Sequence, residues 1–394
     1  MKRFAKLLTF WIPVRAWRHW LRDHIESALT SLIPLKENWV IFYDTFSKSG
    51  NGDSIRPLAI ELRKRKPNMR FFFVAKEQKN IEMADEVLII GSKRYEYVLR
   101  RAKYLFSPMD LPASKRPGQI WVMTWHGNAI KSIYLLKDKS PEMYKQMSRF
   151  KPVDYWMIPS QKTKDIFKEM FNLPDNIFVD TGIPRNDILF ADNKTKENIR
   201  KKVRQKYGLK KSDKIIFYCP TWRNDRYKMP FMIDIKLLKK IIGSKYKLLI
   251  RSHVGKHDWV DNDGNTFKFD DDFMIDVGEH AMISDLYLIA DILICDYSSA
   301  ILDFAILKKP IILFDYDYKD YIKKTGFCYD YKQEMPGPIV YTTKELAEAI
   351  SSIDTIKKQY AKKYKSFIEK WNSFEQGNAT QQILDLILNR KETK

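Results

Sequence analysis

Residues 290–317 read ADILICDYSSAILDFAILKKPIILFDYD, and this stretch decides the fold class. The apolar run Ile292–Cys295 is typical of a buried strand, and the polar turn 296–299 follows it. Residues 300–307 repeat apolar side chains at helical spacing, and 310–314 is a second apolar run. Strand, turn, helix and strand in this order make a βαβ unit of a parallel sheet.

The turn of that unit would face the ligand crevice of the sheet, where helix N–H groups favour anions. Ser298 or Ser299 would also cap the following helix in a protein without any ligand. The turn therefore predicts an anion site only if other polar stretches meet at the same crevice.

The same alternation continues on both sides and predicts an α/β fold with two doubly wound, Rossmann-like domains facing a cleft, which is a GT-B-like arrangement. A lysine-rich stretch at 191–212 suggests the boundary. We expect a segment 1–34, a first domain 35–195 and a second domain 196–394 that includes C-terminal helices. The expected strands are 39–43, 71–75, 86–90, 104–106, 119–124, 154–158, 177–179, 214–218, 246–251 and 273–277. The expected helices are 54–65, 93–101, 161–171, 196–207, 235–242 and 284–289.

The net charge of +21 predicts a polyanionic partner, either nucleic acid, anionic lipid or a phosphorylated substrate. The basic residues are scattered and match no nucleic-acid motif, so we expect no nucleic-acid partner. Three widely spaced cysteines give neither a metal-ligand spacing nor a disulfide framework, which fits the cytoplasm. No Walker loop is present and no GxGxxG follows the first strand, so no tightly held cofactor is expected.

The N-terminal segment is amphipathic, and Arg15, Arg18 and Arg22 interrupt any signal-peptide core. Tryptophans beside arginines are typical of a helix that lies on an anionic membrane surface. A helix that packs its apolar stripe on the first domain would have the same pattern. The apolar residues are Phe4, Leu7, Leu8, Trp11, Ile12, Trp17, Trp20, Leu21 and Ile25.

Several polar residues follow predicted strands directly, and so belong to one edge of each sheet. His126 ends one strand and is the side chain best suited to proton transfer near neutral pH. Arg251 and His253 end another strand and could hold a pyrophosphate. Each of these residues taken alone is as well explained by a structural role. The remaining candidates are Thr221, Arg223, Asp296, Ser298 and Ser299. Further cleft residues are Gly127, Arg185 and Asn186, of which Arg185 and Asn186 could instead bridge the domains.

Together these stretches resemble the CDP-glycerol glycerophosphotransferase family, which includes teichoic-acid glycerol-phosphate primases and polymerases and their capsule relatives. Each motif is weak, but the ordered set is specific and covers roughly residues 39–377. Asn128 stands where that family usually has threonine, and Val254 where it usually has proline. The matching segments are 124–127, 181–187, 220–223, 251–253, 284–286, 295–299, 303–305, 309–312 and 336–338.

The resemblance implies a transferase that uses a CDP-activated polyol phosphate without a metal. It implies that His126 is the general base and that Arg251 and His253 bind the pyrophosphate. It implies a donor-binding role for Ser298 and Ser299 with Asp296 beside them, and for Thr221 and Arg223 near the phosphates.

The resulting hypothesis is a peripheral enzyme at the cytoplasmic face of the membrane. Its partners would be CDP-glycerol or a similar CDP-polyol, a lipid-linked acceptor and the anionic membrane surface. A nucleotide-sugar glycosyltransferase of the same fold, or a non-catalytic membrane scaffold, are the alternatives. The sequence leaves open which polyol is transferred and which glycan the acceptor carries. It also leaves open whether the enzyme adds one unit or polymerises.

Overall fold

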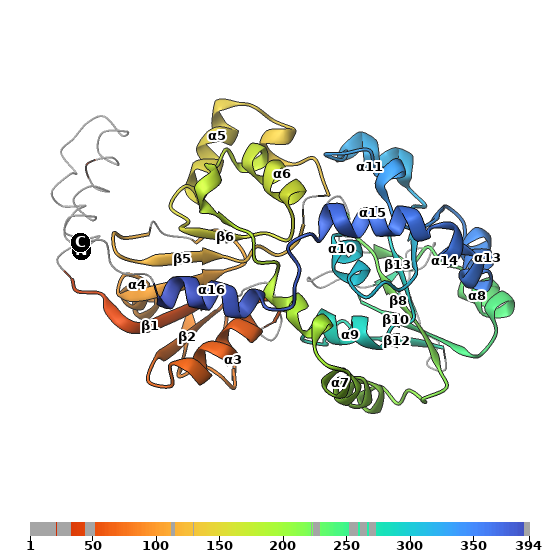
Figure 1. Cartoon of the computed structure of the whole chain (residues 1–394), viewed down its shortest axis with the longest axis horizontal. Coiled ribbons are helices and arrows are strands. Elements are labelled where there is room, and N and C mark those ends of the chain that lie inside the picture. Colours follow the sequence, from red (N-terminus) through yellow and green to blue (C-terminus); the bar gives the residue numbers. More distant parts are fainter. Residues whose placement is uncertain are drawn as a thin grey trace.

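The computed structural model describes residues 21, 33–43, 52–111, 115–128, 130–221, 223, 229–251, 259–260, 266–267 and 273–389. Two α/β domains lie side by side along the long axis of the molecule (Figure 1). The predicted fold class of two Rossmann-like domains is confirmed. The predicted amphipathic segment 1–34 lies almost wholly outside the described residues, so its membrane role stays a prediction.

The first sheet has seven parallel strands in the order β3-β2-β1-β4-β5-β6-β7. The chain begins in the middle of the sheet, moves to one edge and then to the other, which is the doubly wound arrangement. Because strands such as Arg70–Ala75 are buried on both faces, they read as continuous apolar runs. The strands are β1 (Lys36–Tyr43), β2 (Arg70–Ala75), β3 (Glu86–Ile89), β4 (Ala102–Ser107), β5 (Ile120–Met123), β6 (Tyr155–Met157) and β7 (Phe178–Val179).

Helices cover both faces of this sheet. On one face, α3 (Ile55–Arg65) packs Leu58 and Leu62 against Phe42 of β1. On the other face, α4 (Lys93–Leu99), α5 (Pro141–Met147) and α6 (Gln161–Phe171) bury an aromatic core around Trp156. Short 3₁₀ turns η1 (Tyr134–Leu136), η2 (Ser148–Phe150) and η3 (Asp175–Ile177) connect these elements.

The second sheet has six parallel strands in the order β12-β10-β8-β13-β14-β15. Its strand order reverses between β8 and β13, which is where α/β sheets open their ligand crevice. The strands are β8 (Lys214–Cys219), β10 (Tyr246–Ile250), β12 (Met274–Asp276), β13 (Ile292–Cys295), β14 (Ile311–Phe314) and β15 (Ile339–Val340). A small separate pair is formed by β9 (Met229–Pro230) and β11 (Trp259–Val260).

Helices also cover both faces of the second sheet. On one face lie α8 (Ile235–Ile242) and α13 (Thr343–Ser351), and on the other α7 (Asn193–Lys206), α9 (Ile283–Ile289), α10 (Ala300–Ala305) and α15 (Ala361–Trp371). The shorter helices are α11 (Tyr318–Lys324), α12 (Tyr331–Glu334) and α14 (Ile353–Gln359). No helix within the described ranges is both long and apolar enough to cross a bilayer.

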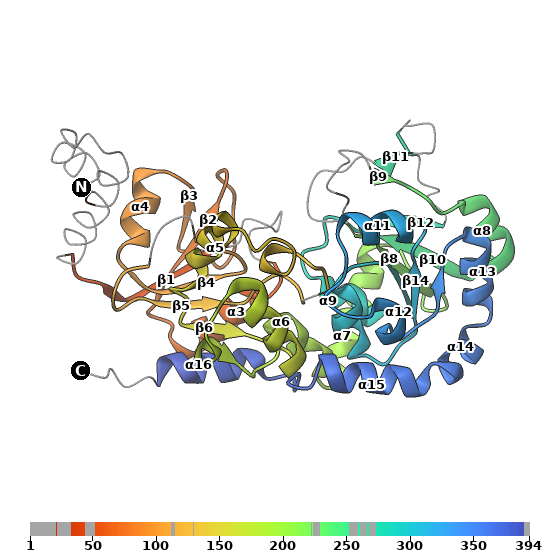
Figure 2. The ribbon, with the colours of Figure 1, turned by 90° about the horizontal axis from the view of Figure 1, so that it is seen from above.

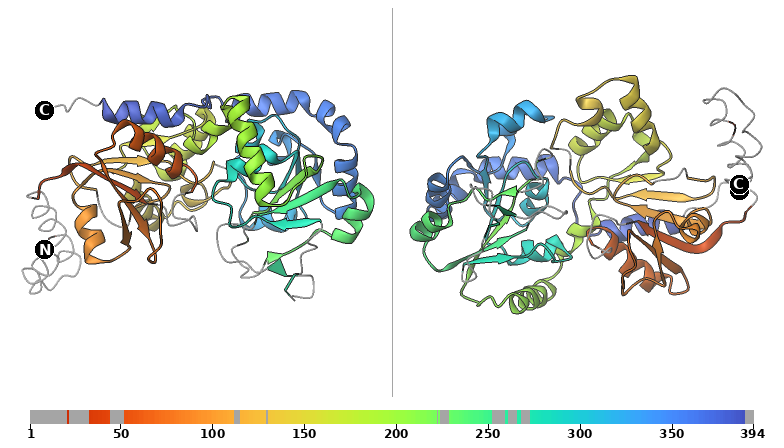
Figure 3. Two further views of the ribbon diagram at one scale, coloured as in Figure 1. Left: turned by 90° about the horizontal axis from the view of Figure 1, so that it is seen from below. Right: turned by 180° about the vertical axis from the view of Figure 1, so that it is seen from behind.

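The C-terminal helix α16 (Ala379–Leu388) returns to the first domain. Ile383 and Leu384 are fully buried in the same core as Phe42 and Leu58. The views from above and below show α15 and α16 extending in turn along the two domains (Figures 2 and 3). The prediction that 196–394 forms one domain is therefore wrong for α16, because its apolar stripe completes the core of the first sheet. The chain crosses between the domains first at η4 (Pro184–Phe190) and again just before α16.

The βαβ unit predicted from residues 290–317 is confirmed. Strands β13 and β14 pair in parallel, with Leu293 beside Ile311, and α10 lies between them in the chain. The helix ends earlier than predicted. Lys308 has a φ of 55°, a left-handed conformation that cannot continue a right-handed helix.

Candidate active site

A cavity of about 190 Å³ lies between the two domains and is lined by both. It brings together five of the predicted site residues, namely His126 and Gly127 from the first domain and Thr221, Ser298 and Ser299 from the second. The other lining residues are Trp125, Asn128, Ile130, Lys131, Ile133, Tyr134, Phe167, Met170 and Tyr297.

The five predicted residues in the cavity follow the carboxyl ends of β5, β8 and β13. In the second sheet β8 and β13 are neighbours, and Cys219 pairs with Cys295. Thr221 and the turn 296–299 therefore leave the sheet side by side, at the point where its strand order reverses. This position is the reason that residues far apart in the sequence share one cavity.

The backbone turns sharply at Trp125, a strained residue that follows the end of β5. Trp125 has a φ of 51°, which costs a non-glycine residue about 1–3 kcal/mol. Its ring is 5.4 Å from that of Trp156 and 5.1 Å from that of Phe171, so aromatic packing holds the strained backbone. The turn this imposes positions His126 in the cavity.

The imidazole of His126 has a defined hydrogen bond. Nδ1 lies 3.0 Å from the carbonyl oxygen of Pro108, which follows β4. Because a carbonyl only accepts, Nδ1 carries the proton in the neutral ring and Nε2 carries the lone pair. Desolvation by the surrounding protein lowers the pKa of His126 from its usual 6.5, and the positive charges of Arg185 and Lys131 act in the same direction. The neutral ring is therefore favoured at pH 7. A neutral imidazole with this tautomer is equipped to accept a proton.

Gly127 lies close to the second domain in the cavity. A Cβ at this position would lie only 2.7 Å from Oγ of Ser299. A side chain at residue 127 would therefore force the hydroxyl group of Ser299 out of its present position in the cavity.

Asp296 and Arg223 form a buried frame behind the cavity. Asp296 is 1% exposed and accepts hydrogen bonds from the backbone N–H groups of Thr221 and Tyr297, both at 2.7 Å. Arg223 is 6% exposed and its guanidinium donates to Asp296 at 3.0 Å and to Asp317 at 2.7 Å. The two residues predicted as donor ligands are thus engaged with each other and with the backbone, and they hold Thr221 and the turn in place.

Arg185 and Asn186 were predicted either to lie at the cleft or to bridge the two domains. In the structure they form hydrogen bonds that join the domains. Arg185 donates to Asp303 of α10 at 2.9 Å, and Asn186 donates to Asp303 at 3.2 Å and to Glu375 at 2.8 Å. Burial raises the pKa of Glu375 to about 8, although its bond from Asn186 opposes that shift. Both side chains are buried in this polar network, and they are not among the residues that line the cavity in the described part of the chain. A role for them in ligand binding stays a prediction.

Arg251 lies at the carboxyl end of β10, next to β8, and donates to the carbonyl oxygen of His280 at 2.6 Å. It does not line the cavity within the described part of the chain. His253 lies outside the described residues, so the proposed role of the Arg251–His253 motif in binding pyrophosphate stays a prediction.

Two cavity residues were missed as candidates. Lys131 follows His126 on the same loop, which pairs at Lys131 with Phe327 of the second domain. Burial lowers the pKa of Lys131 to about 8, although the negative charge of Asp296 raises it. Asn128 was noted only as a departure from a family pattern, yet it lines the cavity. A search of the loop after His126 for cations would have found Lys131.

Two buried polar atoms in the cavity have no hydrogen-bond partner among the residues that the structure describes. They are Nδ2 of Asn128, a donor, and Oγ1 of Thr221, a donor and acceptor. Such atoms cost free energy unless a ligand or water satisfies them. Together with the ammonium group of Lys131, they suit an anionic ligand. Within the described ranges, no three His, Cys, Asp or Glu side chains gather as a metal-ligand set.

Comparison with known proteins gives the family. Residues 26–389 match the family model described as CDP-Glycerol:Poly(glycerophosphate) glycerophosphotransferase. The chain is 30% identical over 387 residues to a teichoic acid poly(glycerol phosphate) polymerase of Bacillus spizizenii, covering 91% of this chain and 94% of that one. It is 29% identical over 388 residues to the corresponding polymerase of Staphylococcus epidermidis, covering 93% of this chain but only 53% of that protein.

The solved structure of the wall teichoic acid polymerase TagF has the same fold. It aligns with a TM-score of 0.82 and 27% identity, covering 98% of this chain and 97% of that one. A variant of TagF soaked with CDPG aligns with a TM-score of 0.80. The match to the family model spans both domains and all the described cavity residues, so this chain belongs to the CDP-glycerol:poly(glycerophosphate) glycerophosphotransferase family.

Proposed function

We propose that this chain transfers glycerol phosphate from CDP-glycerol to a hydroxyl group of a lipid-linked acceptor in teichoic acid synthesis, and releases CMP. The observation that carries the proposal is that His126 and the polar groups of Thr221, Ser298 and Ser299 face one cavity from opposite domains. The family membership and the similarity to teichoic acid polymerases support the same reaction.

In this reaction Nε2 of His126 takes the proton of the acceptor hydroxyl. The acceptor oxygen then bonds to the phosphorus that carries glycerol, and the bond from that phosphorus to the oxygen of CMP breaks. CMP leaves with the electron pair of that bond. Asn128, Thr221 and Lys131 supply donors and positive charge for the phosphate oxygens. Positioning and electrostatic stabilisation provide most of the rate enhancement in phosphoryl transfer.

The proposal is tested by incubating the full chain and a lipid-linked acceptor with a panel of activated donors, followed by mass spectrometry of the product. We expect CMP release with CDP-glycerol and a product heavier by whole glycerol phosphate units, whose number separates single addition from polymerisation. Preference for CDP-ribitol would change the assigned polyol. UDP or GDP release from a nucleotide sugar would instead favour a glycosyltransferase, and no turnover with any donor would favour a scaffold.

Lys131 is proposed to bind the donor phosphates. Replacing it with methionine should weaken CDP-glycerol binding about 10- to 100-fold, because a hydrogen bond to a charged group is worth about 1.5–3 kcal/mol. Since its pKa is about 8, Lys131 loses its charge above that pH. The wild-type Kd, measured by calorimetry, should therefore rise above pH 8, whereas the Kd of Lys131→Met should change less. Exposed Lys139 is the control, and an equal effect of Lys139→Met would contradict the assignment.

We also propose that residues 1–34 hold the enzyme on the cytoplasmic face of the membrane, as a peripheral protein. The motivating observation is their pattern of tryptophans beside arginines. Deleting residues 1–25 should lower sedimentation with anionic vesicles while leaving CMP release with a water-soluble acceptor unchanged. Neutral vesicles serve as the control, and unchanged sedimentation with anionic vesicles would refute the membrane role.

A further inference from the structure

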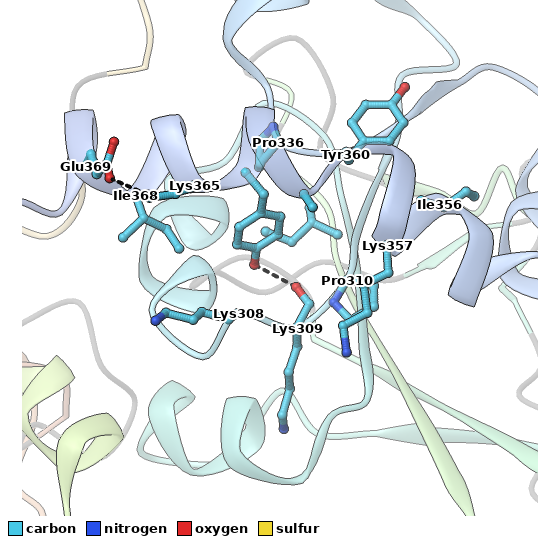
Figure 4. Close-up of a pocket in the computed structure, with 14 residues that line it drawn as sticks. Lys308, Lys309, Pro310, Pro336, Ile356, Lys357, Tyr360, Lys365, Ile368 and Glu369 are labelled. Atoms are coloured by element: carbon cyan, nitrogen blue, oxygen red, sulfur yellow. Dashed lines mark hydrogen bonds and ion pairs between the residues drawn. The ribbon is translucent and has the colours of Figure 1, made fainter.

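The second domain contains a larger cavity that the proposed reaction does not use. It is a groove of about 460 Å³ between helices α14 and α15 and the segment that leads into β14 (Figure 4). Lys308, Lys309 and Pro310 precede β14, so the groove opens at the amino end of that strand. The active-site cavity lies at the carboxyl ends of the strands, and the two cavities share no lining residue.

The interior of the groove is apolar and preformed. Ile311, Pro336 and Gly337 lie on the sheet side, and Ile356 and Ile368 come from the two helices. Tyr364 lines the same space, but its hydroxyl group is engaged, donating to the carbonyl oxygen of Lys309 at 2.6 Å. Sites for small molecules typically have about 300–1,000 Å³ and apolar walls. The groove therefore has the size and surface to hold a hydrocarbon chain.

The rim of the groove is basic. Lys308, Lys357 and Lys365 line it, and the single acidic lining residue, Glu369, lies 3.8 Å from Lys365 in an exposed ion pair. The side chain of Lys309 leads away from the groove and donates to the carbonyl oxygens of Leu288 and Ala290 (Figure 4). Residues 353–371 contain six lysines and only two acidic residues. An apolar interior with a cationic rim suits a molecule with an apolar chain and an anionic head.

We propose that this groove binds one hydrocarbon chain of an anionic membrane phospholipid, with the lipid phosphate at the lysine rim. Two other occupants are disfavoured by charge. The N-terminal segment is itself basic, with Lys2, Arg3 and Lys6 among its first residues, and a second copy of the chain carries a net charge of +21. An anionic lipid gains from the same charges, because lysine and arginine side chains near a membrane surface attract anionic lipids. Such binding would attach the second domain to the membrane independently of residues 1–34.

The apolar part of the proposal is tested with octyl, decyl and dodecyl phosphate, each below its micellar concentration, in calorimetric titrations of the full chain. Each methylene buried should tighten binding up to about fourfold, since it contributes about 0.8 kcal/mol. Ala361 lines the groove and is exposed, so Ala361→Trp should fill the groove without disturbing the core and abolish the dependence on chain length. Ser366→Trp, on an exposed position of the same helix outside the groove, should bind as the wild type does.

The charged part is tested with two matched pairs of substitutions. Lys357→Glu with Lys365→Glu reverses two rim charges, whereas Lys358→Glu with Lys362→Glu makes the same change of charge on the same helices outside the groove. Dodecyl phosphate should bind at least about tenfold more weakly to the first pair only. Equal losses in both pairs, or wild-type binding by Ala361→Trp, would overturn the lipid site. Because no donor is present, these outcomes are independent of the proposed transfer reaction.

Discussion

Replacing His126 with alanine is expected to lower the rate of CMP release from CDP-glycerol about 10²- to 10⁴-fold, which is the usual loss for a positioned general base. The expectation rests on the tautomer set by Pro108, which puts the lone pair on Nε2, and on the position of the ring in the interdomain cavity. Stopped assays of CMP release with a saturating lipid-linked acceptor would measure the effect.

The control is the affinity for the donor. CDP-glycerol should bind His126→Ala about as tightly as the wild type, because the proposed phosphate contacts come from Asn128, Thr221 and Lys131. The pH profile gives a second check. The base works in its neutral form, and desolvation together with the nearby positive charges lowers its pKa from the usual 6.5. The wild-type rate should therefore persist to lower pH than an ordinary histidine would allow. Full CMP release by the variant would refute the role of His126.

The largest expected effect on stability comes from Asp303. Its carboxylate and the guanidinium of Arg185 are both 4% exposed and lie 2.9 Å apart. Replacing Asp303 with asparagine keeps the volume but leaves a buried guanidinium without its counter-charge. Breaking a buried pair in this way costs about 3–5 kcal/mol. Urea denaturation followed by tryptophan fluorescence should show the loss as a lower midpoint.

Asp385 provides a matched control, since it pairs with Arg65 on the surface and is 61% exposed. Asp385→Asn should change stability by no more than about 1 kcal/mol. The double variant Asp303→Leu with Arg185→Met should regain part of the loss, because removing both charges also removes the unpaired one. A small effect of Asp303→Asn alone would show that water reaches the Arg185 site.

Much of the fold followed from hydrophobic periodicity. The predicted bounds of α6, α8 and β13 match the structure to the residue, because local apolar spacing and flanking caps or turns determine them. Ser160 and Asp234, for example, accept backbone N–H bonds at the starts of α6 and α8. The return of α16 to the first domain could not be predicted in this way, because an apolar stripe does not show on which sheet a helix packs.

The candidate site was predictable in part. Residues at strand ends, such as His126 and Ser299, could be grouped because parallel strands end at one edge of a sheet. Local sequence does not show which polar side chains form hydrogen bonds with one another and are therefore not available to a ligand. Arg223 and Asp296 were for this reason predicted as ligands, although their contacts form a buried frame. Lys131 was overlooked because a single lysine in a chain with 70 basic residues carries no signal until its burial is known.

The two crossings of the chain between the domains have a mechanical consequence. They lie against each other, since Asn186 of η4 bonds to Glu375 at 2.8 Å and a Cβ on Gly377 would overlap the ring of Phe190. Two adjacent connections allow the two domains to rotate about one axis and resist twisting of one domain against the other. His126 and Ser299 face the cavity from opposite domains, so we expect a rotation about that axis to change the distance between them.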